Sequence, residues 1–250
     1  PRTMPLILAT TTPGEPEIFA SIQGEGLSAG RPCTFVRLSR CNLACEWCDT
    51  AYTWRFTGDN RPHRDAADFD RGQNQIALSE AEIATRIAAL GQPRLVITGG
   101  EPLLQAAALV RMLDALAALA PMQVEVETNG TVAPPPALID RVGHFTVSPK
   151  LAHSGNPVDL ALRPEALSAL VASGKAMFKF VVATPGDAQE AMAVASRLAI
   201  PKERLWLMPE GRDSLTIRER SRWLAEYCSE NELNFSDRLH IHLYGDTRGT

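Results

Sequence analysis

The loop Cys41-Asn-Leu-Ala-Cys45-Glu-Trp-Cys48 decides how the rest of this chain is interpreted. Thiolates are soft ligands that suit zinc or iron–sulfur clusters, and both kinds of site usually take four protein ligands. No fourth cysteine stands near these three. The loop therefore predicts a 4Fe-4S cluster with one iron open to a ligand that is not protein. A partial zinc site is the alternative that the spacing leaves open.

The composition indicates a chain with a full apolar core. It has 250 residues, of which 45% are hydrophobic and 22% charged, with a formal net charge of −4. We expect one domain spanning 1–250, and the acidic balance disfavours a direct nucleic-acid partner. No apolar run is long enough to predict a membrane span. Met4 is the expected natural start, after a three-residue remnant.

The five cysteines indicate the compartment. An odd number with three clustered, in a chain without a recognisable export signal, favours metal binding over disulfides and predicts a reducing cytoplasm. Cys33 and Cys228 lie outside the loop and are expected to be inert thiols that act as small apolar side chains.

Apolar patterns alternate between strand and helix about six times along the chain. This alternation predicts parallel strands joined by crossovers, and six units are too few for a closed eight-stranded barrel. We therefore expect an α/β fold, a partial (β/α)6 barrel with a seventh strand near the C-terminus. The expected strands are 34–38, 94–97, 123–127, 145–147, 177–182, 205–208 and 239–243; the expected helices are 79–90, 104–119, 164–173, 187–198 and 215–229.

Several stretches fall outside this alternation. Residues 1–15 are expected to form an N-terminal extension, 16–26 a polar turn and 134–136 a loop. Residues 57–75 are polar and contain glycine and proline, which predicts an irregular insertion. The remaining polar motifs follow the carboxyl ends of the expected strands, the end at which barrels of this kind carry their active sites.

The motifs together resemble a known family. The cysteine spacing and Thr98-Gly-Gly-Glu-Pro102 resemble the radical S-adenosylmethionine superfamily. Further stretches are similar to the 7-carboxy-7-deazaguanine synthase family over nearly the whole chain. They are Phe19-Ala-Ser-Ile-Gln-Gly-Glu-Gly26, Thr34-Phe-Val-Arg-Leu38, Trp47-Cys48-Asp49-Thr50, Glu127-Thr-Asn-Gly-Thr131 and Ser148-Pro-Lys150.

This resemblance implies conversion of 6-carboxy-5,6,7,8-tetrahydropterin to 7-carboxy-7-deazaguanine with release of ammonia, a step toward queuosine and other 7-deazapurines. It implies a 4Fe-4S cluster, S-adenosyl-L-methionine and Mg²⁺ as cofactors. A 5′-deoxyadenosyl radical would abstract hydrogen, and magnesium would assist the ring contraction. The expected partners are the pterin, an electron donor such as flavodoxin or ferredoxin, and a second copy in a homodimer.

The resemblance also assigns the substrate contacts. Arg37 is charged within a buried strand, and a guanidinium suits the substrate carboxylate; an ordinary ion pair is the alternative. Thr50 is the expected magnesium ligand, and with Arg37 it is the expected catalytic pair. Glu25 and Glu127 could instead be a solvated turn residue and a polar strand residue. The expected substrate contacts are Ile22, Gln23, Gly24, Glu25, Arg37, Thr98, Glu127, His242 and Thr250.

Cofactor contacts follow from the same resemblance. Gly100 would let the backbone approach S-adenosylmethionine, and Glu101 would accept a hydrogen bond from its ammonium group. Cys41, Cys45 and Cys48 would hold the cluster. The expected cofactor contacts are Trp47, Cys48, Asp49, Gly100, Glu101, Ser148, Pro149, Lys150, Met208, Pro209, Glu210 and Gly211. Two features depart from the family: residues 57–75 and the longer C-terminal tail.

The motifs leave one other enzyme class open. An activating enzyme that places a radical on a protein partner would share the cysteine loop and the Gly-Gly-Glu segment, but it would not need Gln23 or Arg37. A radical enzyme that modifies RNA directly is disfavoured by the acidic charge.

Overall fold

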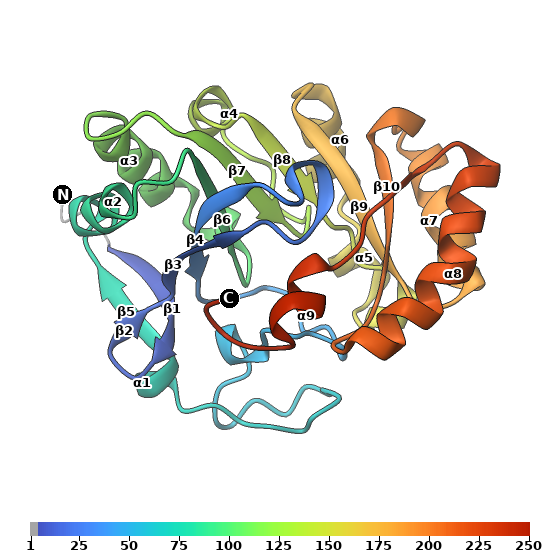
Figure 1. Cartoon of the computed structure of the whole chain (residues 1–250), viewed down its shortest axis with the longest axis horizontal. Coiled ribbons are helices and arrows are strands. Elements are labelled where there is room, and N and C mark those ends of the chain that lie inside the picture. The colour runs from blue at the N-terminus through green and yellow to red at the C-terminus, as the bar shows by residue number, and fades with distance from the viewer. Residues whose placement is uncertain (1–4) are drawn as a thin grey trace.

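The fold is built on one sheet of eleven strands (Figure 1). The structure, a computed structural model, describes residues 5–250, so the expected start at Met4 lies outside the described residues. The strands are β1 (Leu6–Thr12), β2 (Glu15–Pro16), β3 (Ile18–Ile22), β4 (Pro32–Leu38), β5 (Gln75–Leu78), β6 (Arg94–Gly99), β7 (Gln123–Thr128), β8 (His144–Val147), β9 (Ala176–Val182), β10 (Leu205–Pro209) and β11 (Asn234–Phe235).

The strand order is β11-β10-β9-β8-β7-β6-β4-β1-β2, with β3 paired to β4 and β5 paired to β1. All neighbours from β4 to β10 are parallel, as the alternation predicts. Parallel pairing brings the carboxyl ends of six strands to one edge of the sheet. The polar motifs that follow these strands therefore meet there, although they lie far apart in the sequence.

The two faces of the sheet differ because successive side chains on a strand point to opposite sides. On β7, Val124 and Val126 belong to the main apolar core, whereas Glu125 and Glu127 point to the other face. On β4, Val36 and Leu38 enter the same core, and Arg37 lies opposite. We call the face that carries Glu127 and Arg37 the site face.

Most helices cover the face opposite the site face, whereas the last helix lies on the side of the site face (Figure 1). Ser79 caps α2, because its hydroxyl accepts a hydrogen bond from the Glu82 amide at 3.3 Å. The helices are α1 (Arg71–Asn74), α2 (Glu80–Ala89), α3 (Ala106–Ala117), α4 (Pro136–Arg141), α5 (Val158–Ala161), α6 (Pro164–Ala172), α7 (Pro185–Arg197), α8 (Ser214–Asn231) and α9 (Leu239–Tyr244).

The predicted strand at 239–243 is wrong, because this segment is the short helix α9. Its alternating sequence imitates a strand, but only Ile241 is buried, and the Leu239 amide bonds to the Gly24 carbonyl instead of a sheet neighbour. The seventh parallel strand is β11, which pairs with β10.

The N-terminal predictions also need correction. The expected extension at 1–15 contains β1, which pairs with β4 and β5, and the expected turn at 16–26 contains β3. These antiparallel strands are invisible to a search for strand–helix alternation. The insertion at 57–75 is irregular as far as Asp70, after which α1 and β5 begin. The loop expected at 134–136 leads directly into α4.

Candidate active site

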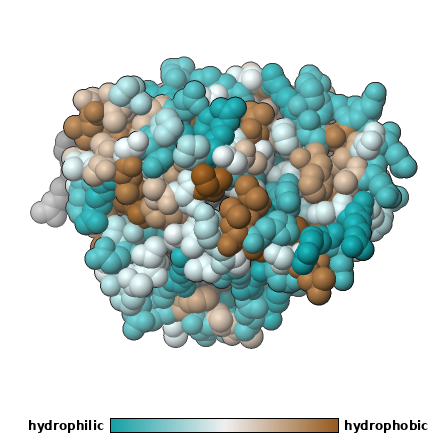
Figure 2. All heavy atoms as spheres, viewed as in Figure 1, coloured by the Kyte–Doolittle hydropathy of each residue, from teal (hydrophilic) through white to brown (hydrophobic). Residues whose placement is uncertain are grey.

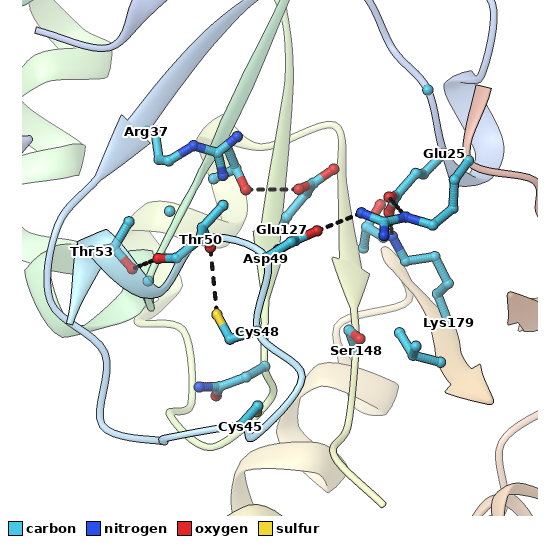
Figure 3. A pocket seen from close by; sticks show the side chains of 18 of the residues that line it. Glu25, Arg37, Cys45, Cys48, Asp49, Thr50, Thr53, Glu127, Ser148 and Lys179 are labelled. Atoms are coloured by element: carbon cyan, nitrogen blue, oxygen red, sulfur yellow. Dashed lines mark hydrogen bonds and ion pairs between the residues drawn. The ribbon is translucent and has the colours of Figure 1, made fainter. Parts of the chain in front are cut away.

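One cavity of about 210 Å³ opens at the carboxyl ends of the parallel strands (Figure 3). It is lined by most residues singled out in the sequence, including all three clustered cysteines, so the fold brings segments from 22 to 250 together. The predicted residues that line it are Ile22, Gln23, Gly24, Glu25, Arg37, Cys41, Cys45, Trp47, Cys48, Asp49, Thr50, Thr98, Gly100, Glu127, Ser148, Lys150, Met208, Glu210 and Thr250.

Each clustered thiol receives an N–H donor. Asn129 Nδ2 lies 3.8 Å from Cys41 Sγ, Asn156 Nδ2 lies 3.3 Å from Cys45 Sγ, and Trp54 Nε1 donates to Cys48 Sγ at 3.4 Å. Hydrogen bonds to the sulfurs are a regular feature of iron–sulfur sites, where they stabilise the negative charge of the cluster. The donor set therefore fits a cluster held by three thiolates.

A single metal ion fits this loop less well. Among residues 5–250, no three His, Cys, Asp or Glu side chains converge closely enough to hold one ion. Burial raises the pKa of Cys41 to about 12 and that of Cys45 to about 11. Both thiols therefore keep their protons at neutral pH until a metal displaces them.

The Gly-Gly-Glu segment packs against the backbone at the start of the cysteine loop. A Cβ on Gly100 would lie 2.1 Å from the Arg40 carbonyl oxygen, so glycine is needed for this close approach of two backbones. Glu101 is fully buried and accepts hydrogen bonds from Leu103, Thr128 and Asn129. Its side chain does not line the cavity, and its contact with the methionine ammonium stays a prediction.

Arg37 has a carboxylate partner beside the cavity. Its Nε lies 2.8 Å from Glu17 Oε1, and Tyr52 donates to the same carboxylate. Burial would lower the pKa of Arg37, but Glu17 outweighs this effect and raises it. Within residues 5–250 the two terminal guanidinium nitrogens make no hydrogen bond, so they can still bind a carboxylate in the cavity. Glu17 thus orients Arg37: the expected ion pair is present, and the contact with the substrate carboxylate stays a prediction.

Gln23 separates two carboxylates on the site face of β7. Its Nε2 donates to Glu125 Oε1 at 3.2 Å and to Glu127 Oε1 at 3.1 Å, while its Oε1 accepts from the Glu25 amide. Both N–H groups of its side chain are therefore used within the protein, and Gln23 fixes the position of Glu127. Gln23 lines the cavity, and its contact with the pterin stays a prediction.

The two carboxylates have opposite pKa shifts. Burial raises the pKa of Glu127, although Lys179 opposes this, and Thr98 donates to its Oε2 at 2.7 Å. Burial also acts on Glu125, but hydrogen bonds from His144 and Ser28 outweigh it and lower the pKa. Such pairs separate the role of an acid from that of a fixed charge. Glu127, which lines the cavity, is the one that can present a proton.

Glu25 belongs to a buried charge network and is not a solvated turn residue. It pairs with Lys179 and, at 2.9 Å, with Arg238, whose other arm binds Asp49 (Figure 3). Burial would raise the pKa of Glu25, but Lys179, Arg238 and His240 hold it well below its ordinary value. One guanidinium therefore joins the loop after β3 to the loop that follows the cysteines.

The sequence analysis missed three titratable side chains that line the cavity: Lys179, Arg238 and His240. Lys179 carried a signal, since it is the one charge in the buried strand β9. His240 lies in the cavity wall, whereas the predicted His242 contacts Ser214 and Asp237 outside it. In a strand these two side chains would share one face, whereas in the helix α9 they point in different directions.

Most of the cofactor-side predictions fall on the cavity wall. Lys150 Nζ binds Ser148 Oγ at 2.8 Å and lies 5.5 Å from the centre of the Trp47 ring. Thr50 Oγ1 lies 3.7 Å from Cys48 Sγ. Three further predicted contacts do not line the cavity: Pro149, Pro209 and Gly211.

The irregular insertion also contacts the cysteine loop. The Arg64 amide bonds to the Glu46 carbonyl at 2.8 Å, and His63 Nε2 lies 2.8 Å from the Cys48 carbonyl oxygen. Arg64 also pairs with Glu210 in the cavity wall. These contacts connect the insertion to the site, which its polar sequence alone does not reveal.

Comparison with known proteins agrees with this geometry. Residues 22–134 match the family described as a 4Fe-4S single cluster domain. The 7-carboxy-7-deazaguanine synthase of Pyrobaculum aerophilum is 37% identical, over 93% of this chain and 95% of that protein. The synthase of Hyperthermus butylicus is also 37% identical, over 90% of both chains. The crystal structure of QueE from Escherichia coli superimposes with a TM-score of 0.64 and 25% identity, covering 94% of this chain and 95% of that one.

Proposed function

This chain belongs to the 7-carboxy-7-deazaguanine synthase family, and we propose that it converts 6-carboxy-5,6,7,8-tetrahydropterin to 7-carboxy-7-deazaguanine with release of ammonia. The family consists of radical S-adenosylmethionine lyases, and this chain is such an enzyme. The observation that carries the proposal is that the three cluster cysteines, Arg37 and Glu127 line one cavity.

The cofactors are part of the proposal. Cys41, Cys45 and Cys48 would hold a 4Fe-4S cluster, and S-adenosylmethionine would bind beside it in the same cavity. When bound, this pair supplies the 5′-deoxyadenosyl radical that abstracts hydrogen from the substrate. Trp47 and Lys150 contribute to the wall on the cofactor side of the cavity.

The remaining wall binds and orients the pterin. The terminal nitrogens of Arg37 bind its carboxylate, and Thr50 holds Mg²⁺ against the same group, since magnesium takes few protein ligands and completes its shell with substrate oxygen and water. Burial raises the pKa of Glu127 and so favours its protonated form, which donates a hydrogen bond to the pterin, since the pterin has acceptor nitrogens. These contacts place the substrate between the cluster loop and β7.

The setting of the enzyme is proposed as well. We take residues 1–250 as one domain and the curved parallel region as a partial barrel of the radical S-adenosylmethionine type. The enzyme would act as a homodimer in the reducing cytoplasm, with electrons from a donor such as flavodoxin or ferredoxin. Within residues 5–250, none of the helices combines the length and the apolar character needed to cross a bilayer.

The test is an anaerobic product assay with the reconstituted, reduced enzyme, S-adenosylmethionine and 6-carboxytetrahydropterin, with and without Mg²⁺. We expect 7-carboxy-7-deazaguanine, and we expect less of it without Mg²⁺. Cleavage of S-adenosylmethionine without deazaguanine would refute the proposal and favour an enzyme that acts on a protein partner. Reconstitution that yields zinc without iron or sulfide would refute both.

The Arg37→Ala variant tests the carboxylate contact. We expect it to cleave some S-adenosylmethionine but to lose most product formation, because the substrate is no longer oriented. Arg86→Ala is the matched control, since Arg86 pairs with Glu82 on the exposed side of α2, away from the cavity. Equal product formation by both variants would remove Arg37 from the substrate site.

A further inference from the structure

Residues 151–156 follow β8 and belong to no motif found in the sequence. This segment contacts the cysteine loop on the side away from the cavity. The Glu46 amide bonds to the Ser154 carbonyl at 2.9 Å, and the Ala44 amide bonds to Asn156 Oδ1 at 2.9 Å. The His153 ring stacks on the Trp47 ring with centroids 5.4 Å apart. Three residues of the cysteine loop, Ala44, Glu46 and Trp47, are thus fixed by this segment.

Asn156 makes the most specific of these contacts. Its Oδ1 accepts the Ala44 amide, and an amide oxygen cannot donate, so the orientation of the side chain is determined. Its Nδ2 therefore faces Cys45 Sγ at 3.3 Å, with Ser154 Oγ at 3.1 Å as its second partner. All polar atoms of this amide are satisfied, and one N–H is directed at a sulfur that would bind iron.

We propose that Asn156 is a positioning residue that raises the reduction potential of the cluster by donating a hydrogen bond to the Cys45 sulfur. The inference rests on the proposed function, because it requires a cluster on these thiolates. Reduction adds negative charge to the cluster and its sulfurs, so an N–H donor stabilises the reduced state more than the oxidised one. Without this N–H donor, the cluster accepts the electron that starts the reaction less readily.

Two substitutions at Asn156 separate the effect on the reduction potential from the structural contact with the Ala44 amide. Asn156→Asp keeps an acceptor for the Ala44 amide, removes the N–H donor and adds negative charge. Asn156→Ala removes both contacts. Asn231→Ala is the control, because the Asn231 amide donates only to the Tyr227 carbonyl within α8.

The measurement is an anaerobic redox titration of the reconstituted enzymes at pH 8, followed by electron paramagnetic resonance of the reduced cluster. We expect Asn156→Ala to lower the one-electron reduction equilibrium constant about tenfold, which is about 59 mV. Asn156→Asp should lie lower still, and the control should match the parent. Cluster-loaded Ala and Asp variants with the parent potential would overturn the proposal.

A second measurement does not depend on the variants retaining a cluster. In the parent enzyme labelled with ¹⁵N-asparagine, pulsed electron paramagnetic resonance should detect a coupling from the side-chain nitrogen of Asn156. This coupling should vanish in any loaded Asn156 variant, whereas a coupling from Asn129, which faces Cys41, should remain. Absence of the coupling in the parent would overturn the inference. A parent enzyme that assembles no iron–sulfur cluster would instead refute the proposed function.

Discussion

Replacement of Arg238 by methionine tests how the site is held together. Arg238 is 7% exposed, and its guanidinium contacts Glu25, Asp49 and the Gly211 carbonyl oxygen. Methionine retains much of the side-chain volume and removes the charge. Three segments far apart in the sequence lose their common partner at once.

The expected loss of stability is about 3 kcal/mol, at the low end of the range for breaking a buried pair. Glu25 keeps Lys179 as a partner, which limits the cost. Asp49 loses its cation, but 33% of its side chain is exposed, so water can partly replace the guanidinium. A fully buried Asp49 would place the loss nearer 5 kcal/mol.

Arg212→Met is the matched control, because Arg212 also makes two ion pairs. Its partners Asp65 and Asp246 are 42% and 31% exposed, and its own side chain is 27% exposed. Exposed pairs contribute about 0.2–1 kcal/mol each, so the control should lose about 1 kcal/mol. The assay is urea unfolding of the metal-free proteins, followed by circular dichroism.

The pH dependence of the free energy of unfolding provides a second measurement. The pKa values of Glu25 and Asp49 are held below their ordinary values in the folded protein. Their contribution to stability is therefore present above about pH 5 and is lost as the pH falls through about 4 and below. Arg238→Met should lose less stability over this acid range than the parent. Equal losses for the Arg238 and Arg212 variants at neutral pH, with unchanged acid profiles, would refute the reasoning.

Three further predictions concern the cavity. Gly24→Ala should raise KM at least about tenfold with little change in cluster content, measured by steady-state kinetics, because the new Cβ would lie 2.2 Å from His240 Nδ1. Gly100→Ala should reduce the iron and sulfide bound per chain, measured by chemical analysis, because its Cβ would meet the Arg40 carbonyl; full loading would contradict this. Glu127→Gln should keep more turnover than Glu127→Ala, and its rate should not fall as the pH rises, whereas the parent rate should fall as Glu127 loses its proton at a pH above the ordinary pKa of a glutamate. A parent rate that stays flat as the pH rises above that ordinary pKa would count against a protonated Glu127.

The parallel part of the fold could be predicted from the sequence because its signals are local. Alternation of strand and helix specifies parallel neighbours, and parallel strands bring their carboxyl ends to one edge. The cysteine loop, Thr98 and Glu127 follow such ends, so their meeting in one cavity needed no knowledge of the packing. Residues 239–243 show the limit of local pattern, because a six-residue helix can have the alternation of a strand.

The charge partners of the site could not be predicted in this way. Glu17 lies on the connection between two antiparallel strands, and its pairing with Arg37 depends on β3 lying beside β4. Arg238 precedes α9 and has no motif around it, yet it joins Glu25 to Asp49. Lys179 was visible as a lone charge in an apolar strand, but its partner was not.

The sequence by itself determined the chemistry of the cluster loop. The number and spacing of Cys41, Cys45 and Cys48 are covalent facts, and so is the position of Arg37 within a buried strand. Tertiary structure alone decided which groups face these residues. Asn156 reaches Cys45 across 111 residues of sequence, because contacts between segments depend on how helices and strands pack in space, and no local pattern records that packing.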